Sequence, residues 1–172
     1  MCGRFTLMTN LEKWSERFQI EVIPFDWPSR YNIAPSQMVA AVISDHGQRR
    51  LGQLRWGLVP SWARDEKIGN KIINARAETL TEKPAFKNLF ARKRCIILAD
   101  GFYEWQKIGK GRRPMRIVMK TGEPFAFAGL FDTWTSPSGD KLHTCTIVTT
   151  KPNDVVADIH DRMPVILHQE SL

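Results

Sequence analysis

The sequence lacks the features of a membrane protein and of an unfolded chain. No apolar run approaches the roughly 18 residues that a helix needs to cross a bilayer, so no membrane partner is expected. The start of the chain has no basic segment followed by an apolar one, which argues against a secretory signal. Hydrophobic residues make up 42% of the chain and charged residues 25%, a globular composition that excludes bulk disorder.

Cysteine is scarce, and no pattern of metal ligands is visible. The three cysteines, Cys2, Cys95 and Cys145, form no C-x-x-C pair, and their odd number argues against a disulfide framework. The four histidines lack the spacing of zinc ligands. We therefore expect no metal, no cofactor and a reducing, cytoplasmic location, at the nucleoid if the source is bacterial. Cys95 and Cys145 lie in apolar runs and are expected to be buried strand thiols.

Acidic residues are the minority among the charges. Lysine and arginine number 25 against 18 aspartates and glutamates, which gives a net charge of +7. A basic balance favours polyanions, nucleic acid first, through counterion release, although many basic proteins bind no polyanion. The basic residues gather in short segments at 49–50, 92–94 and 107–116, so folding must assemble any binding surface.

The pattern of apolar residues predicts a strand-rich chain. Its 172 residues suffice for one domain, 1–172, with a core that needs no disulfide. A hairpin of strands 38–44 and 51–58 is expected around the turn Asp45-His46-Gly47. Further strands are expected at 2–7, 72–76, 95–98, 102–107, 115–119, 125–134, 142–150 and 165–167. We predict an α+β domain, predominantly β, in which about seven or eight of these ten segments form an antiparallel or barrel-like sheet, with a few peripheral helices.

The expected helices are short. Thr9 and Glu12 have the spacing of a capping box, and Leu11, Trp14 and Phe18 then share one helical face. Residues 82–90 and 153–159 predict two more helices, the second with its N-cap near residue 153. Prolines in 23–35 and polar residues in 60–71 predict irregular loops.

Cys2 is the most informative residue. Methionine is normally removed when a small residue follows it, which would leave Cys2 with a free α-amine beside its thiol. The reference pKa is about 7.7 to 8.0 for the amine and about 8.5 for the thiol, so both are partly deprotonated near neutral pH. Such an aminothiol captures aldehydes as a Schiff base that closes to a thiazolidine, and it can also attack an amide. The alternative is a passive, buried cysteine.

Several other side chains could belong to a site, and each also has an ordinary structural explanation. Asn74 ends an apolar run and could present its amide to a ligand, or it could be a turn residue. Arg76 would share the face of Asn74 and could bind a phosphate. Glu104 lies between aromatic residues, which favours a raised pKa and proton transfer, unless it is a surface ion-pair partner. His160 is a natural acid or base, or a hydrogen-bonded turn histidine.

Two residues could bind nucleic acid directly. Trp62 lies in the polar loop and could stack on an unpaired base, which contributes about 1 to 3 kcal/mol, or it could pack in the core. Arg162 could bind a phosphate or form a surface salt bridge.

Taken together, six segments of the chain resemble the SRAP family (SOS response-associated peptidase). They run in order along almost the whole chain, and their combination is highly specific. The segments are MCGRF at 1–5, YNIAP at 31–35, RWGLVP at 55–60, INARAE at 73–78, CIILADGFYEW at 95–105 and DIHDRMP at 158–164.

The resemblance implies a β-rich fold with one active site facing a positively charged channel for single-stranded DNA. It implies that Cys2, after removal of Met1, forms a thiazolidine with the ring-opened deoxyribose of an abasic site. Asn74 matches the residue that orients the amine and sugar, Glu104 the proton-transfer residue, and His160 the residue that assists ring opening. The positions that match DNA contacts are Arg4, Asn32, Pro35, Trp62, Arg76, Thr149 and Arg162.

The predicted function is that of a DNA-damage response protein of the SOS type that crosslinks abasic sites, with a lyase-like, slowly reversible step. One alternative is a cysteine-type peptidase or autoprotease that uses Cys2 and needs no DNA. Another is a non-enzymatic single-stranded DNA binder, which would not depend on Cys2. We expect a monomer whose partners are DNA and replication-fork proteins. Family members usually continue beyond the DIHDRMP segment, so the chain is expected to lack their C-terminal extension.

Overall fold

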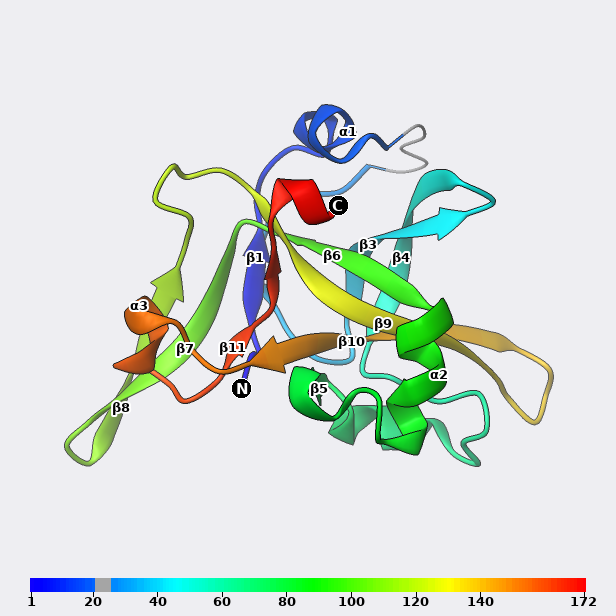
Figure 1. Cartoon of the computed structure of the whole chain (residues 1–172). Coiled ribbons are helices and arrows are strands. Elements are labelled where there is room, and N and C mark those ends of the chain that lie inside the picture. Colours follow the sequence, from blue (N-terminus) through cyan, green and yellow to red (C-terminus); the bar gives the residue numbers. More distant parts are fainter. Residues whose placement is uncertain (21–25) are drawn as a thin grey trace.

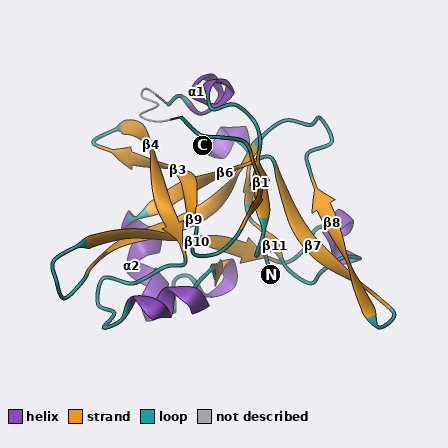
Figure 2. Cartoon of the chain, turned by 180° about the vertical axis from the view of Figure 1, so that it is seen from behind, coloured by secondary structure: helices purple, strands orange, loops and turns teal. Residues whose placement is uncertain are grey.

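The computed structural model describes residues 1–20 and 26–172, in which strands dominate and helices are short (Figures 1 and 2). The strands are β1 (Phe5–Leu7), β2 (Arg30–Ile33), β3 (Met38–Asp45), β4 (Gln48–Trp56), β5 (Asn74–Arg76), β6 (Arg94–Ala99), β7 (Gly101–Ile108), β8 (Gly111–Ile117), β9 (Phe125–Thr135), β10 (Lys141–Thr150), β11 (Met163–Pro164) and β12 (Ile166–Leu167). The helices are α1 (Glu12–Phe18), α2 (Pro84–Arg92) and α3 (Asp154–Ala157), with single 3-10 turns η1 (Glu66–Lys71), η2 (Ala77–Thr79) and η3 (Gln169–Ser171).

Five strands close into a barrel. Strands β4, β3, β6, β9 and β10 pair in that order, and β10 pairs back with β4. The prediction of a predominantly β, barrel-like fold is confirmed. One detail differs, because β10 runs parallel to β4 and to β5, where antiparallel pairing was expected. Parallel pairing requires a crossover, which the intervening chain supplies, because β5 to β9 lie between β4 and β10 in the sequence.

A second sheet packs on the barrel and carries the start of the chain. Its strand order is β2-β1-β7-β8. The Phe5 ring lies 5.3 Å from the Trp56 ring and 5.5 Å from the Phe127 ring, in edge-on contacts. Phe102 of β7 also packs on Phe127, at 6.0 Å. Because these aromatic rings join both sheets, the residues that precede Phe5 are held against the barrel.

Most predicted elements are found close to their predicted bounds. The β3–β4 hairpin turns at His46 and Gly47, with φ of 50° and 82°, the two positive values that a type I′ turn requires. Asn153 caps α3 by accepting a hydrogen bond from the Val156 amide. Cys95 and Cys145 are buried in β6 and β10, as expected.

The capping box predicted at Thr9 is wrong. The Thr9 amide and hydroxyl both donate to the Asp100 carboxylate, so Thr9 is not available to cap a helix. Helix α1 starts at Glu12 instead, whose amide donates to the Asn10 side chain. The predicted apolar face is correct, since Trp14 and Phe18 are fully buried.

The loop predicted over 23–35 is also wrong in part. Residues 23–25 of that loop lie outside the described residues, and Arg30–Ile33 forms strand β2, which pairs with β1. Pro28 and Pro35 flank this strand, so they do not interrupt its hydrogen bonds. The described residues hold twelve strands, more than the seven or eight predicted, and the two without a counterpart among the predicted segments, β2 and β11, are only four and two residues long. The loop predicted at 60–71 ends in the 3-10 turn η1.

The backbone at Gly57 passes very close to the backbone at Gly69, and this contact fixes the position of β5. Gly57 has φ of +127°, and a Cβ there would lie 2.6 Å from the carbonyl oxygen of Gly69. Glycine is therefore required at this crossing. The adjacent Leu58 amide donates to the Ile72 carbonyl at 2.9 Å, which fixes the chain that enters β5.

Candidate active site at the start of the chain

The four residues predicted to be catalytic come together in the folded chain. Cys2 precedes β1, Asn74 begins β5, Glu104 lies in β7 and His160 follows α3. The Asn74 side-chain amide donates to the Cys2 carbonyl at 3.1 Å. His160 Nε2 lies 3.9 Å from Glu104 Oε2. These segments are far apart in sequence and meet beside the N-terminus in Figure 1.

The α-amine of Met1 occupies the centre of this group. Its nitrogen lies 3.2 Å from Glu104 Oε1 and 3.0 Å from both ring nitrogens of His160. A pocket of about 320 Å³ opens here, and its walls also include Gly3, Arg4, Trp105 and Arg112. The site therefore already holds an amine between a carboxylate and an imidazole.

The alternation of β7 explains why Glu104 points inward. Phe102 and Glu104 are both buried, at 0% and 2% exposed, and residues two apart on a strand share a face. Burial raises the pKa of the Glu104 carboxyl, while the α-amine and His160 oppose that rise. A carboxyl group with a raised pKa can donate and accept a proton near neutral pH.

The Cys2 thiol is fully buried. Burial and the nearby Glu104 charge raise its pKa above the usual range for cysteine, so the thiol is protonated at neutral pH while Met1 is in place. In this form the α-amine belongs to Met1, so Cys2 is not yet an aminothiol. Removal of Met1 would create the second reactive group.

Two buried oxygens at the site accept no hydrogen bond of good geometry among the described residues. They are Asn74 Oδ1 and Glu104 Oε1, the second of which has the α-amine as its ion-pair partner. Nearly all buried polar atoms in folded proteins are hydrogen-bonded, so such an exception requires an explanation. Both oxygens are acceptors, which fits a site that receives a donor such as an amine or a sugar hydroxyl.

The predicted DNA-contacting residues fall into two groups according to the elements that carry them. In the first group, Arg4, just before β1, donates to the side chain of Asn32 in β2 at 3.1 Å. Pro35 lies just beyond β2 and is half-buried. Trp62 lies in the loop after β4 and is 63% exposed, so the core-packing alternative does not apply to it.

In the second group, β5 and β10 bring three predicted residues together. Arg76 is exposed and pairs in register with Thr149. Arg162 donates to the Thr149 hydroxyl at 3.1 Å and forms a two-pronged ion pair with Glu78, at 3.0 Å for each bond. The guanidinium of Arg162 is therefore fixed in place rather than free.

Sequence reasoning missed three residues here. Glu78 was not singled out, although it fixes Arg162 and follows Arg76 in the same motif. Trp105 and Arg112 line the pocket, and neither was predicted to do so. The alternation along β7 offered a signal for Trp105, whereas Arg112 depends on the register of the β7–β8 hairpin.

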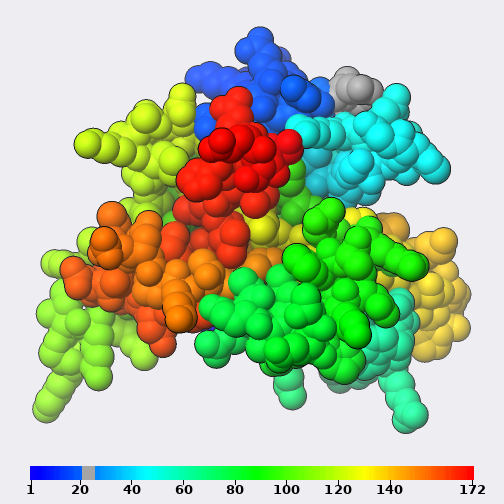
Figure 3. Space-filling model, viewed as in Figure 1, coloured from blue at the N-terminus to red at the C-terminus, as the bar shows by residue number. Residues whose placement is uncertain are grey.

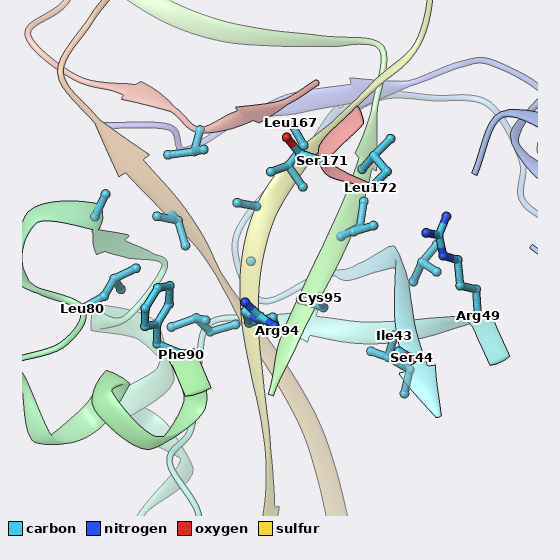
Figure 4. A pocket seen from close by; sticks show the side chains of 18 residues that line it. Ile43, Ser44, Arg49, Leu80, Phe90, Arg94, Cys95, Leu167, Ser171 and Leu172 are labelled. Carbon is cyan, nitrogen blue, oxygen red and sulfur yellow. The ribbon is translucent and has the colours of Figure 1, made fainter. Parts of the chain in front are cut away.

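A separate apolar cavity of about 660 Å³ lies on the barrel, between α2 and the last residues of the chain (Figure 4). Its wall includes Leu80, Phe90 and Leu167, with Arg49 and Arg94 among the few charged residues. None of the candidate catalytic residues lines it. Its apolar lining offers no pair of groups that could exchange protons, unlike the pocket that contains Glu104 and His160.

Two classes of feature are not found among residues 1–20 and 26–172. No group of three or more histidine, cysteine, aspartate or glutamate side chains could hold a metal ion. No helix in this part of the chain is long and apolar enough to cross a membrane.

Comparison with known proteins identifies the family. The chain is 55% identical to the abasic site processing protein YoqW of Bacillus subtilis, over 99% of this chain and 78% of that protein. It is 37% identical to the abasic site processing protein HMCES of Gallus gallus, over 72% of this chain and 44% of that protein. A crystal structure of a Bacteroides thetaiotaomicron protein superposes with a TM-score of 0.86 at 30% identity, over 98% of this chain and 78% of that one. The family profile of SOS response associated peptidases matches residues 1–172, and the chain belongs to this SRAP family.

Proposed function

We propose that this protein acts in the DNA-damage response by capturing abasic sites in single-stranded DNA as a covalent thiazolidine at Cys2. The observation that carries the proposal is that Glu104 and His160 line one small pocket next to Cys2, whose carbonyl accepts a hydrogen bond from Asn74. The curated relatives are named abasic site processing proteins, which supports the same substrate.

The chemistry needs an aldehyde, which the ring-opened deoxyribose of an abasic site supplies. After hydrolysis of the Met1–Cys2 bond, the Cys2 amine attacks C1′ of the sugar, and the aldehyde oxygen leaves as water to give an imine. The Cys2 sulfur then adds to the imine carbon, and the thiol proton ends on the nitrogen. One water is released, and the thiazolidine contains both Cys2 heteroatoms.

The buried groups of the site match these proton transfers. The amine must lose a proton before it attacks, and Glu104 and His160 already contact an α-amine in the Met1 form. The departing hydroxyl must gain a proton, which a carboxyl group of raised pKa can donate. Asn74 holds the Cys2 carbonyl, and its unpaired oxygen can accept from the amine or the sugar.

Recognition of such a lesion depends on its surroundings, because an abasic site has no base to read. Backbone contacts and stacking on neighbouring bases must supply the binding energy. The exposed Trp62 ring offers a stacking surface, Arg4 offers positive charge in the pocket wall, and Arg76 offers it two residues after Asn74 in β5. Unpaired bases can stack on a side chain only in a single strand, which favours single-stranded DNA as the substrate.

The test is a denaturing gel of the purified protein with single-stranded DNA that carries one abasic site, with the intact mass read in parallel. We expect a protein–DNA band that withstands denaturation and free protein lighter by one methionine. Cys2→Ala should abolish the band, and Cys95→Ala, which removes another buried thiol, should retain it. Absence of the band from folded, methionine-free protein would contradict the proposal.

The family description names a peptidase, and the same Cys2 groups could attack an amide. A peptidase would cleave peptides in the absence of DNA, whereas capture of an aldehyde requires the abasic strand. We expect no cleavage of a mixed peptide library under conditions in which the crosslink forms. Cys2-dependent cleavage of peptides without DNA would favour the peptidase instead.

A further inference from the structure

The β7–β8 hairpin has an unusual charge. From Trp105 to Gly122 the sequence holds six basic residues and no acidic one. In Figure 3 this yellow-green hairpin stands out from the body of the molecule beside α3 (orange). Lysine and arginine side chains on a protruding hairpin are strongly hydrated and repel one another, so their accumulation here calls for an anionic partner.

The register of the hairpin separates these charges onto two faces. Lys107 pairs directly with Arg112, and Trp105 pairs with Pro114. Residues opposite each other share a face, so Trp105, Lys107 and Arg112 lie on one side. Arg113 lies on the other side, where its guanidinium donates to Gln106 at 3.2 Å.

The Lys107–Arg112 side borders the pocket of the candidate active site, although Glu104 itself lies on the opposite face of β7, with Gln106 and Arg113. Trp105 and Arg112 both line the pocket that contains Met1, Glu104 and His160. Trp105 is 37% exposed, so an aromatic face lies next to the two cations. An aromatic ring beside cations is the usual arrangement of a surface that binds single-stranded nucleic acid.

These two cations have no acidic partner in the part of the chain that the structure describes. Other arginines near the site are neutralised, Arg116 by Asp100 and Arg162 by Glu78. Among the described residues, neither Lys107 nor Arg112 forms an ion pair. Both are exposed and remain available to an external anion.

We propose that Lys107 and Arg112 bind backbone phosphates of the DNA strand as it leaves the pocket, so that the β7–β8 hairpin extends the binding surface beyond the lesion. The inference rests on the proposed function for the identity of the ligand. It assigns the hairpin a positioning role, since the pair would hold the flanking strand and touch none of the reacting atoms. The spacing of a cross-strand pair on an open face suits a flexible single strand, whose phosphates can adjust to it.

The salt dependence of binding tests this assignment. The ligand is a single-stranded oligonucleotide with a central tetrahydrofuran residue, an abasic analogue that has no aldehyde and cannot be captured. For the double variant Lys107→Gln/Arg112→Gln, we expect the slope of log K against log salt to become shallower by about 1.4, at about 0.7 for each phosphate that the variant no longer neutralises. The ratio of wild-type to variant affinity should then fall about sevenfold between 50 and 200 mM salt.

The matched control is Lys110→Gln/Arg113→Gln, which removes the same charge from the same hairpin, at its turn (Lys110) and on the opposite face (Arg113). Its slope should stay close to that of the wild type. An unchanged slope in the first variant, or an equal change in both, would overturn the inference. All four side chains are exposed, so both variants should fold, as their circular dichroism can verify.

Capture of an aldehyde-bearing abasic strand, measured separately, distinguishes this inference from the proposed function. Capture by the wild type with no change of slope in the first variant refutes only the hairpin's role. A changed slope without any capture refutes the covalent chemistry and leaves the hairpin as a DNA-binding element.

Discussion

Glu104 occupies a position that is unfavourable for a charged carboxylate. Its carboxyl group is buried, its Oε1 atom accepts no hydrogen bond of good geometry among the described residues, and burial raises its pKa. A group with these properties is poorly suited to stabilise a fold, because its ionised form has lost most of its hydration. We infer that the site keeps Glu104 for its chemistry at a cost in stability.

The pH dependence of stability follows from that raised pKa. The folded state binds the Glu104 proton more tightly than the unfolded state, so the free energy of unfolding falls as pH rises above about 4.3, the usual glutamate pKa, to the raised value. Glu104→Gln lacks this titration. The variant should therefore gain stability relative to the wild type between pH 4 and neutral pH, measured by urea denaturation, while its capture of abasic DNA slows. A stability difference that does not change with pH would contradict this reasoning.

Glu78 should behave in the opposite way. Its hydrogen bonds with Arg162 lower the pKa of the Glu78 carboxyl to about 2. A lowered pKa contributes stability that is present above the unfolded value and is lost as pH falls through the folded one. Glu78→Gln should therefore be less stable than the wild type at neutral pH, with a difference that narrows as acid denaturation curves approach about pH 2. A variant as stable as the wild type at neutral pH would show that this exposed pair contributes nothing.

Candidate site residues can be chosen one by one from the sequence, but their contacts with one another cannot. Cys2, Glu104 and His160 stand out because few side chains can perform amine, thiol and proton chemistry. The ion pair of Arg162 with Glu78 spans 84 positions of sequence, and no local pattern indicates it. Sequence offered a phosphate contact or a surface salt bridge for Arg162, and the structure shows the salt bridge.

At the scale of elements, Asp100 joins the strands that carry the site. It lies between β6 and β7 and accepts hydrogen bonds from the Thr6 hydroxyl at 2.6 Å and from the amides of Met8 and Thr9 at 2.6 and 2.8 Å. Burial acts to raise the pKa of this carboxyl, but the hydrogen bonds outweigh it and the pKa is lowered. Asp100 thus holds the end of β1 against β7, and the start of β1 leads directly from Cys2.

Asp100→Asn should destabilise the protein by about 1.5 to 3 kcal/mol, the usual contribution of hydrogen bonds to a charged group. Asparagine replaces one of the two carboxylate oxygens with an NH2 group, which donates and cannot accept. The variant therefore loses either the hydrogen bond from the Thr6 hydroxyl or those from the Met8 and Thr9 amides. The loss should appear in urea denaturation at neutral pH and shrink as pH falls from about 3.9, where the unfolded chain takes up this proton, to the lower pKa of the folded carboxyl. Thr6→Ser, which keeps a hydroxyl donor, serves as the mild control, and an equal loss in both variants would argue against the role of Asp100.

The same cluster explains which elements sequence reasoning missed. Long alternating runs such as β9 and β10 were predicted almost to the residue, since their pattern is local. The start of α1 was not, because Thr9 donates to Asp100, a residue 91 positions away. Strand β2 is equally hidden, since four residues between prolines form a strand only when β1 supplies their hydrogen bonds.

At the scale of the whole molecule, one hydrophobic core joins the barrel and the second sheet. Phe5 and Phe102 come from the sheet, and Trp56 and Phe127 come from the barrel, yet all four belong to one buried cluster. Cys2 is part of this cluster as well. The site is therefore built where the two sheets meet, and neither sheet could form it alone.

This shared core predicts that the chain unfolds in a single cooperative transition. Loss of the second sheet would expose the Phe5 contacts of Trp56 and Phe127, so the barrel should not persist without it. Unfolding curves followed by tryptophan fluorescence and by far-ultraviolet circular dichroism should coincide, as they do for two-state domains. Phe5→Ala, which removes an aromatic ring from the junction, should lower both midpoints together. The free energy of unfolding should fall by about 3 to 5 kcal/mol. If the variant instead separated the two curves, the barrel would be an independent unit, and the active site would open before the barrel unfolds.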